Sequence, residues 1–117
     1  MHKLIKKILG IQDQRQLGSA AVVSNSMLLQ RAFGINEKQL EELARIDEPI
    51  NCGRYDVIVS HRCFDEWMIV MEIVPVGTDP FNCGECPWPV KAEGTCTINI
   101  APEKVMNEVI AYIKENA

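Results

Sequence analysis

The chain has 117 residues and a net charge of −4, with 47% hydrophobic and 24% charged residues. This length predicts a single domain, residues 1–117, that can bury a core without disulfide or metal cross-links. The acidic balance disfavours nucleic-acid binding, which needs a clustered cationic face, and no apolar run approaches the ~18 residues of a membrane span.

The first ten residues form a basic amphipathic stretch. Its apolar residues share one stripe at helical spacing and its lysines lie away from that stripe: Leu4, Ile5, Ile8 and Leu9 against Lys3, Lys6 and Lys7. We interpret residues 1–10 as a helix that docks on the domain, meets a partner or lies on a membrane surface. The stretch lacks the uninterrupted apolar segment of a secretory signal, so a cytoplasmic location is predicted.

Two helices are expected next. Residues 11–18 are polar and are interpreted as a connector, after which Ser19 can cap a helix that runs to Phe33 and is closed by Gly34. A second helix is predicted over Glu37–Ile46, because Asn36 is a good N-cap and Gln39, at the third helical position, completes a capping box. Its acidic surface argues against a DNA-reading helix-turn-helix and for a plain helical hairpin.

The middle of the chain is rich in β-forming residues. Residues 55–61 and 67–76 are predicted as two strands, joined by a hairpin connection over residues 62–66. Both faces of the second strand are apolar, so we expect it to be central, covered on both sides, with Trp67 in the core. Glu72 interrupts one face, and an outward position is the simpler interpretation, with a buried ligand or base as the alternative.

The end of the chain completes the predicted fold. Residues 96–100 alternate as a strand does, and Pro102 can open a last helix without losing a hydrogen bond. The expected architecture is α+β, with a small, mostly antiparallel sheet packed by the N-terminal helices and a C-terminal helix.

The residues with the clearest chemistry lie in a cysteine- and proline-rich segment, residues 78–95, which is predicted as a loop. Cys83 and Cys86 form a C-x2-C knuckle, which can hold a metal ion or form a reversible disulfide. Tetrahedral zinc needs four ligands, so Cys96 is expected as the third and Cys63 as the fourth, with His61 as the alternative fourth ligand. Four thiolates would also suit an iron–sulfur cluster.

These patterns leave two functional hypotheses open. The first is a small cytoplasmic binding or accessory protein whose metal site, with zinc the leading ion, fixes the loop. The second is a thiol-disulfide oxidoreductase or redox sensor that uses Cys83 and Cys86. The odd count of five cysteines excludes complete pairing within one chain and fits a reducing compartment.

Association is the last expectation. The two-sided apolar strand at residues 67–76 and the stripe in residues 1–10 both need burial, and an uncovered apolar patch usually marks an interface. We therefore predict a homodimer, or docking onto a protein partner, through the sheet face or the first helix. Cys52 is a further candidate for the fourth metal ligand, and Trp88, which lies between two prolines, is expected either to shield the thiol site or to face a partner.

Overall fold

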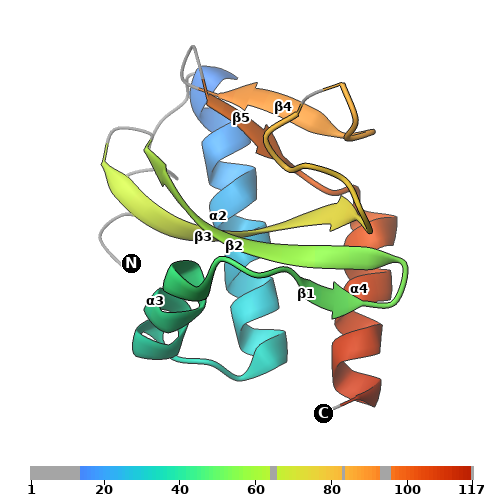
Figure 1. The fold of residues 1–117 in the computed structure, drawn as a ribbon. Coiled ribbons are helices and arrows are strands. Elements are labelled where there is room, and N and C mark those ends of the chain that lie inside the picture. The colour runs from blue at the N-terminus through green and yellow to red at the C-terminus, as the bar shows by residue number, and fades with distance from the viewer. Residues whose placement is uncertain (1–13, 64–65, 83, 93–95, 117) are drawn as a thin grey trace.

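The structure is a computed structural model that describes residues 14–63, 66–82, 84–92 and 96–116. Helices and strands follow one another in this order: α2 (Gln14–Phe33), α3 (Glu37–Ile46), β1 (Ile50–Cys52), β2 (Tyr55–Cys63), β3 (Trp67–Pro75), β4 (Pro89–Ala92), β5 (Cys96–Asn99) and α4 (Glu103–Glu115). Figure 1 shows this arrangement, which confirms the predicted α+β class and the antiparallel sheet.

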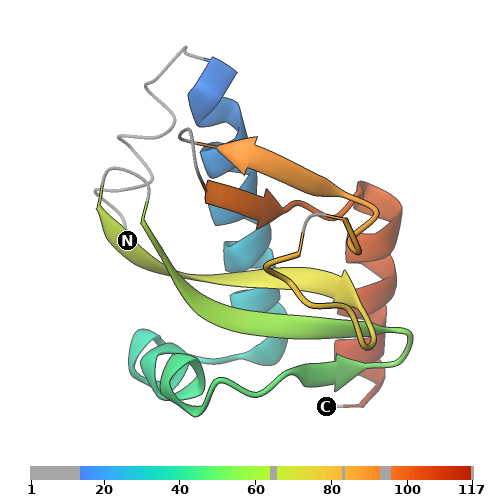
Figure 2. The ribbon, with the colours of Figure 1, turned by 45° about the horizontal axis from the view of Figure 1, so that its top comes forward.

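The strands form two antiparallel groups. The first is a sheet in the order β1-β2-β3, in which Ile58 lies opposite Glu72 and Cys63 opposite Trp67. The second is the β4–β5 hairpin, in which Pro89 pairs with Asn99 and Ala92 with Cys96. Helix α2 packs behind both β3 and the β4–β5 hairpin (Figures 1 and 2). One long helix therefore joins the two groups of strands.

Both faces of the β2–β3 pair are covered. One face meets the helices in the main core, whose members include Val57, Val59, Met71 and Ile73 from the strands and Leu29, Leu40 and Val109 from α2, α3 and α4. On the other face, Val70 packs with Ile98 of β5. The expected two-sided burial of β3 is confirmed over residues 70–74, which the chain itself covers, whereas Trp67 at the start of the strand is exposed.

The position of β3 within the sheet differs from the prediction. It is the last strand of the sheet, not a central one. Two side chains satisfy its outer edge in place of another strand: Ser26 of α2 accepts a hydrogen bond from the Met71 backbone nitrogen at 3.0 Å, and Trp88 Nε1 donates to the Ile73 carbonyl at 2.9 Å. Because these bonds occupy backbone groups on the free edge of β3, they disfavour pairing of this edge with a strand of another chain.

Two predicted boundaries are wrong. Helix α2 begins at Gln14, so residues 14–18 of the expected connector are helical. The predicted loop 78–95 contains strand β4, whose first residue is a proline, as an edge position allows. The capping box at Asn36 and Gln39 is confirmed, with both reciprocal bonds at 2.9 Å.

Candidate functional site

The cysteine loop, residues 76–88, connects β3 to β4 and carries its own hydrogen bonds. Asp79 Oδ1 accepts from the Phe81 backbone nitrogen at 2.9 Å, and Asn82 Oδ1 accepts from the Gly84 nitrogen at 3.0 Å. These bonds form side-chain turns that shape the loop locally. The tip residues Asn82, Gly84 and Glu85 are exposed. The tip of the loop is therefore held by local hydrogen bonds and faces solvent.

The C-terminal end of the loop is anchored on the sheet. Cys86 is buried in a small apolar cluster with Ile58 and Val74, against which Trp88 packs. The Trp88 ring also lies 5.8 Å from the Tyr55 ring, in a tilted arrangement that suits aromatic pairs. Trp88 thus has a structural role: it fastens the end of the loop to the sheet and satisfies the β3 edge.

The structure does not bring Cys63 and Cys86 together. Cys86 packs on Ile58, five residues before Cys63 in β2, which corresponds to about 17 Å of extended strand. Two sulfurs on one zinc ion lie within about 5 Å of each other, since each bond is about 2.3 Å. Cys63 is therefore badly placed as a fourth ligand to an ion held at Cys86.

The other predicted ligands divide between separate places. His61 is exposed on the helix-facing side of β2, and Cys96 pairs with Ala92, the last residue of β4. The cysteine loop joins β4 at its first residue, so the β4 strand separates Cys96 from the loop end by about 10 Å. Cys83 and the Cys96 side chain lie outside the described residues. Within the described part, no three His, Cys, Asp or Glu side chains gather into a metal-binding group.

A buried polar cluster lies beneath the start of the cysteine loop, and its centre is Glu72. This side chain is 1% exposed, so the expected outward position is wrong. The Arg62 Nη2 atom lies 2.7 Å from Glu72 Oε1, and Ser60 Oγ donates to the same oxygen at 3.3 Å. The Asn99 backbone nitrogen and Nδ2 donate to Oε2 at 2.9 and 2.8 Å. We call Ser60, Arg62, Glu72 and Asn99 the Glu72 cluster.

The Glu72 cluster also holds the cysteine loop. Asn99 Nδ2 donates to the Pro80 carbonyl at 2.9 Å, and the Phe81 ring lies over Arg62, with its centroid 4.4 Å from Cζ. The second contact is a cation–π interaction, which strengthens when the cation is desolvated. Strands β2, β3 and β5 and the loop therefore meet at one carboxylate.

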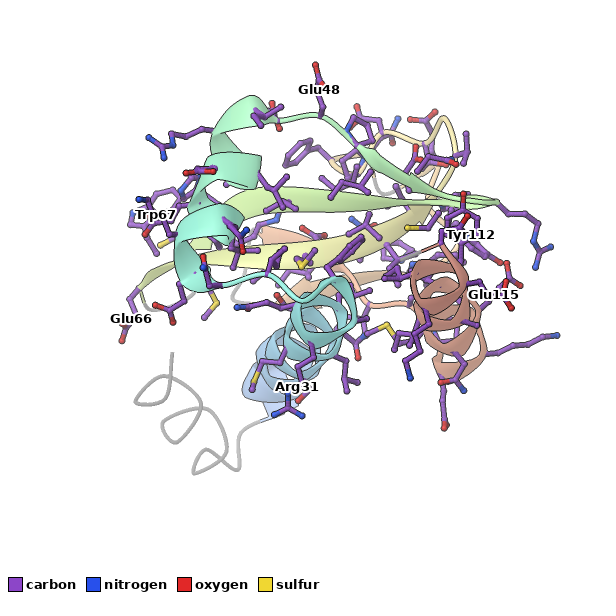
Figure 3. All side chains as sticks on the ribbon, turned by 90° about the horizontal axis from the view of Figure 1, so that it is seen from below. Arg31, Glu48, Glu66, Trp67, Tyr112 and Glu115 are labelled. Carbon is purple, nitrogen blue, oxygen red and sulfur yellow. The ribbon has the colours of Figure 1, made fainter. Side chains whose placement is uncertain are left out.

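The end of the β2–β3 hairpin carries an unusual exposed surface. Cys63 lies opposite Trp67 and His61 opposite Ile69, so these four side chains share the helix-facing side. Trp67 is 72% exposed, which contradicts its expected core position, while Cys63 and Ile69 are half-buried. Figure 3 shows Trp67 at the side of α3. We call His61, Cys63, Trp67 and Ile69 the hairpin-end surface.

Cys52 is a core residue and not part of either site. It is buried, and this burial raises the pKa of its thiol, with a smaller contribution from the nearby Asp56 carboxylate. The thiolate is the reactive form of cysteine, so a raised pKa and poor access both disfavour reaction. We therefore assign Cys52 to packing.

Comparisons with protein-family models, with curated proteins and with solved structures find no match to this chain. Across the described helices, none combines the length and the apolar composition that a bilayer crossing needs. The hairpin-end surface and the cysteine loop are therefore the two features of the described residues that point to a function.

Proposed function

We propose that this chain is a protein-binding module and that the hairpin-end surface is its contact with the partner. The observation that carries the proposal is Trp67, which is 72% exposed at the end of a sheet whose faces are otherwise covered. Tryptophan is enriched among the residues that dominate binding energy at interfaces. A large apolar side chain held on a paired strand costs little conformational entropy when a partner buries it.

The neighbours of Trp67 fit an interface better than a reaction site. Ile69 supplies adjacent apolar area, and exposed His61 supplies a polar rim. This combination, an apolar centre with polar edges, is the usual anatomy of a protein contact. A cytoplasmic setting is part of the proposal, since Cys63 at the interface would be kept reduced there.

Self-association is the simplest form of the proposal, and a twofold dimer is its commonest geometry. The two copies would then contact each other through the same hairpin-end surface. Light scattering at micromolar concentration tests self-association: a mass near twice 13.2 kDa supports a homodimer, and a mass of 13.2 kDa excludes one at that concentration and leaves a different protein as the proposed partner.

Replacing Trp67 by alanine is expected to weaken partner binding by about 30-fold or more, the effect of losing about 2 kcal/mol at an interface hot spot. The measurement is calorimetric titration with a protein captured by the wild-type chain and then purified. Val76→Ala is the matched control, because Val76 is also exposed but follows the opposite end of β3. Equal affinities of the wild type and the Trp67→Ala variant would contradict the proposal.

The cysteine loop supports a second candidate function. Its start is held by the Glu72 cluster and its end by Trp88 and Cys86, so the segment that carries the C-x2-C knuckle is fixed on both sides. Such a loop suits either a metal held partly by the knuckle or a dithiol that exchanges with disulfides. The separation of Cys63 from Cys86 favours chemistry that needs only two thiols.

Elemental analysis of protein purified without oxygen tests this second candidate. About one zinc ion per chain, lost in Cys86→Ser, would support a metal site, and a brown colour would indicate an iron–sulfur cluster. The redox alternative would be supported by metal-free protein in which glutathione disulfide oxidises Cys83 and Cys86 to a disulfide with each other and is itself reduced to glutathione. Metal-free protein that forms no such disulfide would rule out both.

A further inference from the structure

We propose that His61 and Cys63 are two of the four ligands of a zinc ion, and that a second copy of the chain supplies the same two residues to complete the site. This inference rests on the proposed function for the choice of surface, because it makes self-association through the hairpin-end surface depend on a metal ion. The ligand pair itself follows from the geometry of β2.

His61 and Cys63 lie on the same side of β2. Side chains two residues apart on a strand point to the same face, and both residues take part in the regular pairing of β2 with β3. Their Cα atoms are therefore about 7 Å apart. A tetrahedral zinc ion holds a nitrogen and a sulfur ligand about 3.6 Å apart. Because side chains on a strand lean along its direction, the imidazole and the thiol can converge on one ion.

The pair lies at the surface but is incomplete in one chain. His61 is exposed, and Cys63 is half-buried at the last position of β2, opposite the exposed Trp67. Imidazole nitrogen and thiolate sulfur are ligands that zinc prefers, whereas magnesium and calcium take oxygen. In the part of the chain that the structure describes, no third His, Cys, Asp or Glu completes a metal-binding group. One copy therefore leaves tetrahedral zinc two ligands short.

A second copy supplies what is missing. Twofold symmetry, the commonest in homodimers, places an identical pair opposite the first, and the site then has two histidines and two cysteines. Two thiolates balance the charge of the zinc ion, so the completed site is neutral and an interface can bury it without an unpaired charge. Trp67 and Ile69, on the same side of the neighbouring strand, would shield the zinc–sulfur bonds from water.

Metal binding of this kind makes self-association reversible. Each Cys63 thiol releases its proton to solvent when its sulfur binds zinc, and no other reactant is required. The ion joins the two copies only while both pairs bind it, so a chelator that removes the ion breaks every zinc bond between them. The dimer should therefore form with zinc and dissociate when zinc is withdrawn.

The test measures the mass of the full chain by light scattering at micromolar concentration, with a phosphine reductant and either zinc chloride or EDTA. We expect about twice 13.2 kDa with zinc and 13.2 kDa with EDTA. His61→Gln and Cys63→Ser keep a polar side chain of similar size but remove the zinc ligand, so both should stay at 13.2 kDa with zinc. Each should also bind about half a zinc ion less per chain than the wild type, whatever the cysteine loop binds. His2→Gln replaces the other histidine of the sequence and is the control, which should dimerise as the wild type does.

Three results would overturn the zinc proposal. The first is a mass of 13.2 kDa in zinc as well as in EDTA. The second is a dimer that EDTA leaves intact, or one that only the reductant dissociates, which would indicate a disulfide between two Cys63 residues. The third is a zinc-dependent dimer that persists in both ligand variants, which would place the ion elsewhere.

The Trp67→Ala variant separates this proposal from the proposed function. An EDTA-resistant dimer that Trp67→Ala dissociates would retain the Trp67 interface without the metal. A zinc-dependent dimer that is lost in His61→Gln but forms equally well in Trp67→Ala would retain the metal site without the role proposed for Trp67.

Discussion

Glu72→Gln is expected to lower the free energy of unfolding by about 3–5 kcal/mol, because it leaves Arg62 charged and buried without its counter-charge. Both side chains of the pair are almost completely inaccessible to solvent. Glutamine has nearly the same volume and keeps an oxygen that can accept from Asn99. The substitution therefore tests the effect of removing the negative charge separately from changes in volume or in the bonds to Asn99. Urea unfolding followed by circular dichroism measures the loss.

Two further variants make this test specific. Arg62→Met/Glu72→Gln removes both charges and should recover much of the lost stability, since Arg62 Nη2 approaches Glu72 without a well-directed hydrogen bond. Glu108→Ala removes the acid of the exposed Arg54–Glu108 pair and should change the unfolding midpoint far less. A double variant as unstable as Glu72→Gln would show that the hydrogen bonds, and not the charge, carry the effect.

The parts of the fold predicted correctly are those set by local chemistry. Helix α3 is an example, because Asn36 and Gln39 satisfy each other's backbone groups within one turn. Strand β4 was missed for the opposite reason. It has four residues and starts with a proline, and it exists through its pairing with β5 and its packing on α2. Contacts between distant segments of this kind leave little local signal.

The site residues show the same division. Trp67 and Glu72 were assigned opposite environments from those observed, because burial depends on which element covers each part of a strand. Trp67 lies at the uncovered end of the hairpin, while β2 and β5 bring Arg62 and Asn99 to Glu72. A signal for the ion pair was nevertheless present. A hairpin turning near residue 65 places Ser60, Arg62 and Glu72 on one face of two paired strands.

The spacing of Cys83 and Cys86 was enough to predict the cysteine knuckle, but it did not identify the other metal ligands. Spacing along the chain cannot say at which end of a hairpin a distant thiol will lie. The β2–β3 register places Cys63 at the far end from Cys86, and the β4–β5 register places Cys96 at the far end of its own hairpin. Ligand sets assembled from separate loops therefore depend on how distant strands and loops are arranged in the fold, which the spacing of residues along the chain does not give.

Two neighbouring leucines of α2 are expected to respond very differently to replacement by alanine. Leu29 is 0% exposed in the main core, whereas Leu28 is 45% exposed. Leu29→Ala should lower the free energy of unfolding by about 2–5 kcal/mol, because it removes buried apolar contacts and leaves a cavity between α2 and the sheet.

Leu28→Ala is the matched control for this prediction. Alanine favours the helix at least as well as leucine does, so little stability is lost at an exposed position. The measurement compares the urea midpoints of unfolding of the two variants. The midpoints report stability directly when the unfolding free energy of both variants has the same dependence on urea concentration. Equal losses would contradict the burial of Leu29 and the docking of α2 on β3 through this face. A large loss for Leu29→Ala alone would support the packing of α2 against the sheet through the face that carries Leu29.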